Sequence, residues 1–361
     1  MNYDFLIVGQ GIAGSIMGLQ LEKYNQRFLI VDKNEKITSS KVAAGLMHPM
    51  SFKRCVLNWK GETLYDYSHQ FYTKCNEILS DKTYWEFPLV RLFQSYEEQN
   101  NWLSKVSTKP FVHVLSEREE KFDNINNPFG NGRLKKSAKL DASAFIKNVK
   151  LYFERQNNFR EESFSTQNIQ KDGYLYKKGN DLFKYIIFCQ GPFVDEFNPF
   201  SYLPIIPNKG EILEIQSEFL PQFILSKGVF SIPTVEDKFI LGATYNHNDL
   251  SKKITEDARL ELLSKVKKFL PQNNFKIINQ KYGFRPTTID RKPLIGNHPI
   301  LKNAFIFNGM GSRSILMAPL LGKQLIEHIL FDKKLSEAVN VSRFDHYFSA
   351  QHKELCSKLV T

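Results

Sequence analysis

Three glycines and one aspartate near the start of the chain have the types and spacing of a dinucleotide-binding site. The segment reads Gly9, Gln10, Gly11, Ile12, Ala13, Gly14, and Asp32 follows 18 residues later. Glycine permits a tight turn at 9, close backbone approach to a pyrophosphate at 11, and tight helix–strand packing at 14. A carboxylate at 32 can accept bonds from ribose hydroxyls and would repel a 2′-phosphate, which argues against an NADP-type ligand. The alternative is a glycine-rich turn in an ordinary α/β unit.

These residues must be held by a strand, a helix and a second strand. Apolar runs at 3–8 and 28–31 predict two parallel strands, and the segment between them has a helical pattern. The N-terminus of that helix would present free N–H groups and the positive end of its dipole to phosphates. We place Lys33, directly after Asp32, in the same site.

Further segments predict more elements of both types. Helices are expected over 58–80, over 140–156 with a cap at Asp141, over 255–270 with a cap at Thr255, and over 314–331. Strands are expected over 182–189 and 304–308, and an antiparallel sheet over 210–216, 228–233 and 238–243. Strands of nucleotide-binding character therefore lie at both ends and near the middle, with β-rich pieces between them. This order predicts an α/β chain in which a Rossmann-type domain (1–80, 136–205 and 283–361) interleaves with an α+β substrate domain built on an antiparallel sheet (81–135 and 206–282).

Composition narrows the class of protein. The 361 residues are 42% hydrophobic, enough for a large core. The apolar N-terminus reads as a first strand and not as a signal peptide, and no run is expected to reach the apolar length of a membrane span. Four cysteines without metal-type spacing indicate a reduced, cytoplasmic protein without a structural metal. The net charge of +11 fits either solvated surfaces or a basic face for RNA.

Four more segments suit a ring-shaped cofactor. Residues 39–49 (SSKVAAGLMHP) form a loop of small side chains, and residues 186–192 are a strand that ends at Gly191. Residues 282–296 carry Arg285 before a proline, and residues 307–325 are a strand, a glycine turn and a helix. The alternative for the last segment is a plain buried helix after a turn.

Taken in order, these segments resemble the D-amino-acid oxidase/glycine oxidase superfamily of FAD-dependent oxidoreductases, over nearly the whole chain. The supporting motifs are DFLIVGQGIAGS, the AAG loop, PNKGE (207–211), FILGATY (239–245), RPTTIDRKPLIG and GMGSR…AP. The GSR…APLL ending and residues 47–72 also resemble the oxidase half of the bifunctional enzyme that trims carboxymethylaminomethyl-uridine in tRNA. The chain has no room for that enzyme's methyltransferase half.

The resemblance implies FAD as the nucleotide, with its ADP half at Gly9, Gly11, Gly14 and Asp32. It places the flavin beside two sets of residues: Ser39, Ser40, Ala43, Ala44 and Gly45 in the first, and Gly309, Gly311, Ser312 and Arg313 in the second. Some relatives attach FAD through a cysteine just before the Arg-Pro pair. The segment KYGFRP contains none, which implies noncovalent FAD.

Arg285 would bind the substrate's carboxylate, by the same resemblance. The alternative is a structural ion pair with Asp290 or Glu211. Relatives of the glycine oxidase type carry a tyrosine hydroxyl where this chain has Phe230. The candidate replacements are Tyr245, Tyr282 and His48, each of which could equally be core or rim packing.

The implied reaction is hydride transfer from the carbon next to an amine to the flavin, followed by reoxidation by O₂. Three functions stay open: an oxidase of glycine, sarcosine or a D-amino acid; a tRNA-modifying oxidase with the same chemistry; and a flavin-bearing module without activity. The oligomeric state is not indicated.

Overall fold

The larger sheet forms around the strand–helix–strand unit at the N-terminus. Residues 2–172, 175–194, 198–235, 237–270 and 275–357 are described in this computed structural model. Strand β1 (Asn2–Val8) pairs in parallel with β2 (Phe28–Asp32) on one side and β13 (Asp181–Phe188) on the other. The remaining strands are β10 (Phe159–Glu161), β11 (Gln170–Asp172), β12 (Leu175–Lys178), β19 (Leu294–Asn297) and β20 (Ala304–Asn308). The glycine turn after β1 therefore lies at the carboxyl ends of the parallel strands of this mixed sheet, where such folds bind ligands.

The second sheet is almost wholly antiparallel. Its order is β18, β14, β17, β16, β15, β7, β8, and only β15 and β7 run parallel. The strands are β7 (Leu89–Leu92), β8 (Asn131–Leu134), β14 (Ile205–Gln216), β15 (Ile224–Ser226), β16 (Phe230–Pro233), β17 (Lys238–Gly242) and β18 (Lys276–Thr288). Two small sheets complete the strands: β3 (Leu46–Met47), β6 (Tyr84–Glu86) and β9 (Ala138–Leu140), and the pair β4 (Met50–Ser51) and β5 (Val56–Leu57).

The helices cover the larger sheet and one side of the second. They are α1 (Ile12–Lys23), α2 (Ser39–Val42), α3 (Gly61–Ile78), α4 (Tyr96–Leu103), α5 (Ala142–Arg155), α6 (Glu256–Val266), α7 (Ser314–Phe331) and α8 (Ala350–Ser357). Short 3₁₀ turns lie at Phe52–Arg54, Phe111–His113, Thr166–Asn168, Gly311–Arg313 and Val341–Tyr347. Asp141 and Thr255 cap α5 and α6 as predicted, through bonds from Ala144 N and Ala258 N.

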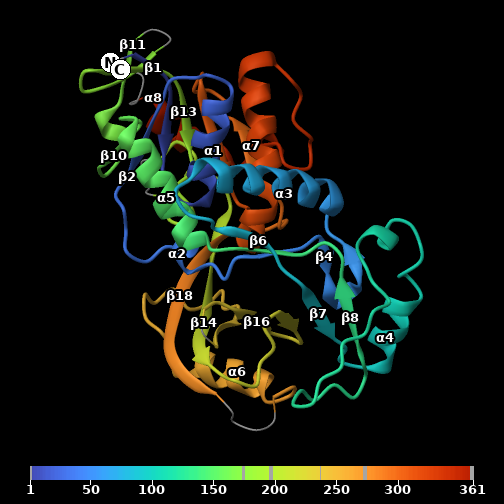
Figure 1. Ribbon diagram of the computed structural model, residues 1–361. Helices are drawn as coiled ribbons and strands as arrows, with labels where there is room; N and C mark the ends of the chain where they lie inside the picture. The colour runs from blue at the N-terminus through green and yellow to red at the C-terminus, as the bar shows by residue number, and fades with distance from the viewer. Residues whose placement is uncertain (1, 173–174, 195–197, 236, 271–274, 358–361) are drawn as a thin grey trace.

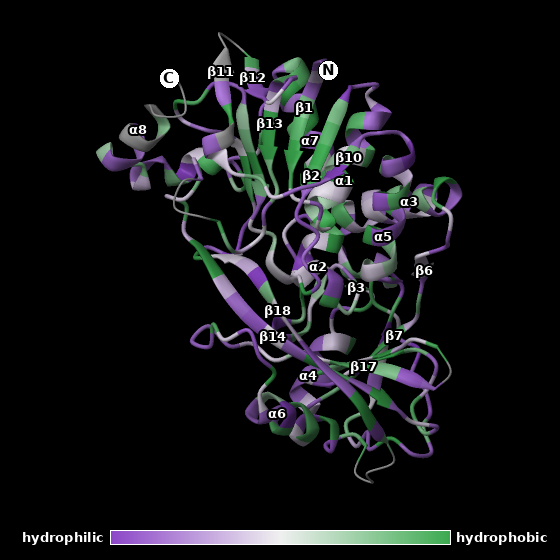
Figure 2. Ribbon diagram, turned by 90° about the vertical axis from the view of Figure 1, so that its left-hand side faces the viewer, coloured by the Kyte–Doolittle hydropathy of each residue, from purple (hydrophilic) through white to green (hydrophobic). Residues whose placement is uncertain are grey.

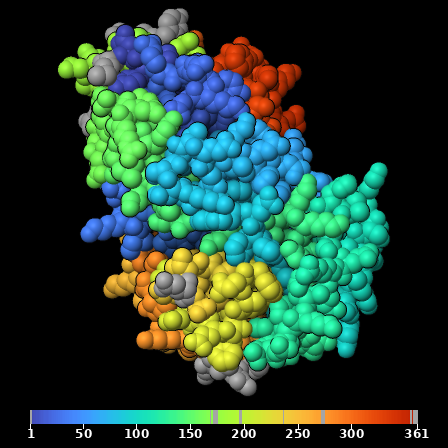
Figure 3. Space-filling model, viewed as in Figure 1, coloured from blue at the N-terminus to red at the C-terminus, as the bar shows by residue number. Residues whose placement is uncertain are grey.

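The sequence prediction of an α/β chain with interleaved segments is confirmed. Figure 1 shows α1, α3, α5 and α7 around the larger sheet, with the second sheet and α6 below it. In Figure 2, β14 and β18 run as a long pair from the lower part up toward the larger sheet. The space-filling view in Figure 3 shows early, middle and late segments together in the upper part. The exact domain limits stay a prediction.

Helix α7 corrects one expectation from the sequence. Residues Gly311–Phe331 are long and apolar enough to cross a membrane by length and composition, although no such run was expected. Half of that segment is buried, and α7 packs against α1 and α3. Burial in the core accounts for its apolar character.

The four cysteines are buried and free.

A proline inside α7 is accommodated by a side chain from α3. Pro319 has no backbone N–H, so it leaves the carbonyl of Ile315, four residues earlier, without its helical donor. The Tyr72 hydroxyl donates to that carbonyl at 3.0 Å, and Ser68 Oγ donates to the next one, Leu316 O, at 2.8 Å. Helix α3 thereby satisfies the first turns of the helix that leads away from the candidate site.

We expect Tyr72→Phe to destabilise the fold by about 1–3 kcal/mol, since it leaves a buried carbonyl without a donor. Pro319→Ala restores a backbone N–H that can donate to Ile315 O. The same Tyr72→Phe change should therefore cost clearly less in a Pro319→Ala background, measured by urea denaturation as a double-mutant cycle. Equal costs in the two backgrounds would show that the hydroxyl does not serve this carbonyl.

Candidate active site

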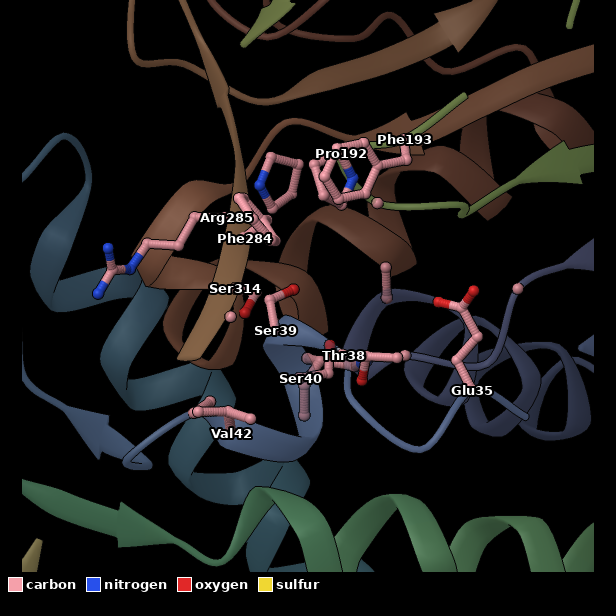
Figure 4. A pocket seen from close by; sticks show the side chains of 18 of the residues that line it. Glu35, Thr38, Ser39, Ser40, Val42, Pro192, Phe193, Phe284, Arg285 and Ser314 are labelled. Carbon is pink, nitrogen blue, oxygen red and sulfur yellow. Dashed lines mark hydrogen bonds between the residues drawn. The ribbon is translucent and has the colours of Figure 1, made fainter. Parts of the chain in front are cut away.

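One large cavity, of about 870 Å³, lies between the two sheets. Figure 4 shows Thr38, Ser39 and Ser40 at α2, Pro192 and Phe193 after β13, and Phe284 and Arg285 on β18 gathered around it. Its volume is at the upper end of the range for small-molecule and cofactor sites, about 300–1,000 Å³. The predicted site residues that line it are Gly9, Gly11, Ile12, Ala13, Asp32, Lys33, Ser39, Ser40, Ala43, Ala44, Gly45, Gly191, Tyr245, Arg285, Gly311 and Ser312.

Two glycines at the turn between β1 and α1 have no room for a side chain. Gly9 has a φ of +98°, and a Cβ there would lie 2.7 Å from Cys189 O. A Cβ at Gly14 would lie 1.8 Å from Gly9 O. Gly14 is not among the residues that line the cavity. It instead sets how closely α1 approaches the end of β1. This is the close approach that a bound pyrophosphate requires.

The N-terminus of α1 faces the cavity, and no acidic side chain there neutralises the positive end of the helix dipole. No acidic residue lies in its first turn, and Gly11 at the N-cap supplies no side-chain cap. The Ser40 hydroxyl from α2 instead accepts from Ile12 N at 3.1 Å. Backbone N–H groups and a hydroxyl thus converge where a phosphate would bind.

Asp32 is fixed at the cavity edge by two backbone amides. Its Oδ2 accepts from Gln10 N at 2.7 Å, and its Oδ1 accepts from Asn34 N at 2.6 Å. Each carboxylate oxygen keeps a lone pair for a ribose hydroxyl. Lys33 points to solvent and pairs with Glu35 at 2.6 Å.

The small-residue loop begins with one helical turn, α2, which the sequence had suggested only as loop. Thr38 caps it by accepting from Lys41 N at 3.2 Å. Gly45 ends the segment with a φ of +86°, and a Cβ there would lie 1.8 Å from Leu140 O. A Cβ at Gly283 on β18 would lie 3.1 Å from Ser39 Cα. Glycines on both sides therefore hold α2 close to β9 and β18.

The turns after β13 and β20 are joined by one buried amide. Asn308 Nδ2 donates to Gly191 O at 2.8 Å, and Asn308 Oδ1 accepts from Gly309 N at 2.8 Å. Gly309 packs against Thr288 and Leu294 outside the cavity lining, whereas Gly311 reaches the lining. The neighbouring Arg313 is exposed and is not among the lining residues.

Arg285 is held in a cradle made by neighbouring strands. It pairs directly with Asn208 in the β14–β18 register, and its Nη1 donates to Asn208 Oδ1 and to Thr244 O, both at 3.2 Å. The Tyr245 ring centroid lies 4.3 Å from the guanidinium carbon. The guanidinium covers Gly210, where a Cβ would lie 2.2 Å from Nη2. The sequence marked the PNKGE segment but could not show that it supports Arg285.

No carboxylate in the described chain pairs with Arg285. The two partners considered from the sequence are engaged elsewhere. Asp290 binds Arg343 at 2.8 Å, and Glu211 accepts from Thr255 N at 3.0 Å and from Thr255 Oγ1 at 2.8 Å. Burial lowers the pKa of Arg285 below its usual value. Within the described residues Nε and Nη2 have no hydrogen-bond acceptor, so these two donors are available to two oxygens of a ligand.

Three of the lining residues contributed by the second sheet are apolar. Ile212, Phe230 and Ala243 come from three adjacent strands or strand ends of the second sheet. Phe230 lines the cavity, and its side chain offers no hydroxyl there. The acidic residues of the lining, Asp32, Glu35 and Glu162, come from the segments around β2 and after β10.

His48 is not brought to the cavity. Its Nδ1 accepts from Met50 N at 3.3 Å, and its ring stacks on Phe52 with centroids 4.8 Å apart. Burial, with smaller effects of Arg313 and Arg91, lowers the pKa of His48 to about 4. A neutral, packed ring outside the lining does not support the catalytic position suggested for it. Tyr282 does reach the lining.

Comparison with known proteins agrees with this geometry. The model of the FAD-dependent oxidoreductase (DAO) family matches residues 4–328. The chain belongs to this family. A glycine oxidase from Pseudomonas aeruginosa is 22% identical over 352 residues, which cover 88% of this chain and 92% of that protein. The crystal structure of glycine oxidase from Geobacillus kaustophilus superposes with a TM-score of 0.77 at 18% identity, over 95% of this chain and 98% of that one, and so shares its fold.

A second kind of relative is longer than this chain. The tRNA 5-methylaminomethyl-2-thiouridine biosynthesis bifunctional protein MnmC from Campylobacter fetus is 22% identical over 311 residues. The match covers 81% of this chain but 46% of that protein. This chain therefore spans about half the length of that relative.

The FAD dependence of the family fits the glycine turn, the N-terminus of α1 and Asp32.

Gly14→Ala should reduce retention of FAD strongly, because the new methyl group would collide with Gly9 O and push α1 away from β1. The measurement is the flavin-to-protein ratio after gel filtration, with far-ultraviolet circular dichroism to verify folding. Gly322→Ala is the matched control: it also lies in a helix, but its Cβ would meet no atom closer than 3.3 Å. Full flavin content in folded Gly14→Ala protein would contradict this account of the turn.

His48 should stay neutral between about pH 5 and 8, because its pKa is lowered to about 4. An unfolded histidine titrates near 6.5, so the unfolded chain binds more protons between these values, and His48 makes stability fall as pH drops from about 6.5 to about 4. The ring resonances, assigned with His48→Gln, should show no titration in that upper range. His48→Gln should also flatten the acid loss of stability; a ring that titrates near 6.5 would refute the lowered pKa.

Proposed function

We propose that this chain oxidises the C–N bond of a small amine or amino acid of the glycine, sarcosine or D-amino-acid type, with the substrate carboxylate bound by Arg285. The observation that carries the proposal is a half-buried guanidinium at the cavity with an open donor edge and no carboxylate partner in the described chain. Such a cation favours a ligand that brings its own negative charge.

The remaining assignments follow from the placement of the segments. We assign the ADP half of FAD to the glycine turn and Asp32, and the flavin to α2, Ala43–Gly45 and Gly309–Arg313. When bound, FAD supplies the acceptor for the hydride that leaves the carbon beside the amine. The N-terminus of α7, preceded by Arg313, favours negative charge at that end of the cavity. No cysteine precedes Arg285 in KYGFRP, which supports noncovalent FAD.

The chain's own contribution is orientation and exclusion of water. Two oxygens on the Arg285 fork would fix the substrate about one end, and the apolar side chains of Ile212 and Phe230 would surround the other. No carboxylate lies in that apolar part of the described lining, so the amine is favoured in its neutral form, which is the form that loses hydride. Water then hydrolyses the imine, and O₂ is the proposed final acceptor of the two electrons.

A second candidate is oxidation of the same kind of amine carried on tRNA. Tyr245 at the cavity is 62% exposed, and the nearby Arg313 and Arg291 have no carboxylate partner in the described residues. An exposed aromatic ring beside cations suits a stacked base and its phosphates. The net charge of +11 and the likeness to MnmC support this candidate.

Anaerobic mixing separates these readings. The FAD-loaded protein is mixed with glycine, sarcosine, D-alanine or bulk tRNA, and bleaching of the flavin absorbance is followed. Bleaching by a free amino acid supports the first proposal, and bleaching by tRNA alone supports the second. A protein that binds FAD but is bleached by none of a wide amine panel would support a flavin-binding module.

The free, buried cysteines support a reducing compartment such as the cytoplasm.

Arg285→Leu should lower kcat/KM for a reactive amino acid by about 100-fold or more, because a buried charge-assisted pair is lost. It should also abolish the preference for glycine over methylamine, which lacks the carboxylate. Arg27→Leu, at an exposed arginine, is the control and should change neither quantity. An unchanged KM in Arg285→Leu would place the carboxylate elsewhere.

A further inference from the structure

Asn208 links the guanidinium of Arg285 to a histidine at the surface. Its side chain lies on β14 with only 1% of the residue exposed. Asn208 Oδ1 accepts from Arg285 Nη1 at 3.2 Å, and Asn208 Nδ2 lies 2.8 Å from the ring nitrogens of His247. His247 is exposed, in the loop that follows β17. The buried amide therefore has Arg285 on one side and a titratable ring on the other.

The chemistry of arginine fixes the direction of both hydrogen bonds. A guanidinium has only donors, so the atom of Asn208 that faces it must be the carbonyl oxygen. The NH₂ group then faces His247, and the histidine nitrogen that receives it must carry no proton. Protonated histidine has donors on both nitrogens. It would repel the NH₂ group or draw the amide into the reversed orientation, which sets donor against donor at Arg285.

We propose that Asn208 is a positioning residue for Arg285 and that it works only while His247 is neutral. This inference rests on the proposed role of Arg285 as the carboxylate ligand. Asn208 is the side-chain acceptor for Arg285 in the described chain; the other acceptor, Thr244 O, is backbone. Loss of the Asn208 bond frees the guanidinium to turn about Thr244 O and misaligns the open edge of its fork.

The other charged groups around His247 do not account for the same behaviour. Lys209 and Asp249 are 2.5 Å apart and compensate each other, and Glu211 lies 3.5 Å from the same ammonium group. Tyr245 and Arg285 face one another. A protonated His247 acting by charge alone would attract a carboxylate ligand and tighten its binding in acid. Acting through Asn208, it weakens binding in acid, so the two effects have opposite signs.

The test is the binding of acetate to the FAD-loaded protein, followed by calorimetry and by the flavin spectrum from about pH 5.5 to about pH 8.5, the range in which histidine titrates. Wild-type protein should bind acetate about tenfold more weakly at the acid end. His247→Gln offers a carbonyl acceptor at every pH and should bind evenly across the range at the wild-type alkaline affinity. Asn208→Leu should bind evenly at the weaker level.

His113→Gln, at another exposed histidine, is the matched control and should keep the wild-type pH profile. Arg285→Leu should abolish acetate binding. If wild-type protein binds no acetate, or if Arg285→Leu binds it normally, the proposed role of Arg285 fails and this inference fails with it. If binding depends on Arg285 but tightens in acid, or if His247→Gln keeps the wild-type profile, this inference alone is overturned.

Discussion

The register between β14 and β18 is the constraint on which the candidate site depends. It sets Asn208 opposite Arg285 and Gly210 opposite Gly283, so that one face of the pair holds the guanidinium and the adjoining backbone lets α2 come close. A slip of one residue would turn Arg285 to the other face of the sheet. Because the paired strands run from the second sheet to the cofactor cavity, the same register joins the two parts of the molecule.

Electrostatics supports the proposal that Arg285 binds an anionic ligand. A guanidinium withdrawn from water loses hydration that a carbonyl, an amide oxygen and an aromatic face replace only in part. Elsewhere in the same sheet the buried cation Lys209 has Asp249 and Glu211 as partners. The contrast between a compensated lysine and an arginine without a carboxylate partner in the described residues, on adjacent strands, supports the proposal that Arg285 serves ligand binding and Lys209 the structure.

The sequence predicted the parts of the fold that local pattern determines. The β1–α1–β2 unit, the capped helices α5 and α6, and α7 follow from apolar periodicity and capping residues. It did not show the cradle, because Asn208, Thr244 and Arg285 meet only through long-range strand pairing. His48 was misplaced for a different reason, its side-chain orientation: its neighbours in the chain are near the cavity, but its ring turns toward Phe52. The turn glycines were informative because their spacing is a local pattern, although the atom that excludes a side chain at Gly9 belongs to Cys189, far away in the chain.

The contact between Gly210 and Arg285 means that positions 210 and 285 are expected to change together in evolution. Any side chain at 210 would occupy the space of the Arg285 guanidinium, so a substitution there is tolerated only if the arginine moves or is replaced. Under the proposed role of Arg285, descendants of this chain that take a substrate without a carboxylate would be free to lose both constraints together. A larger residue at 210 would thus mark such a change of substrate before any activity is assayed.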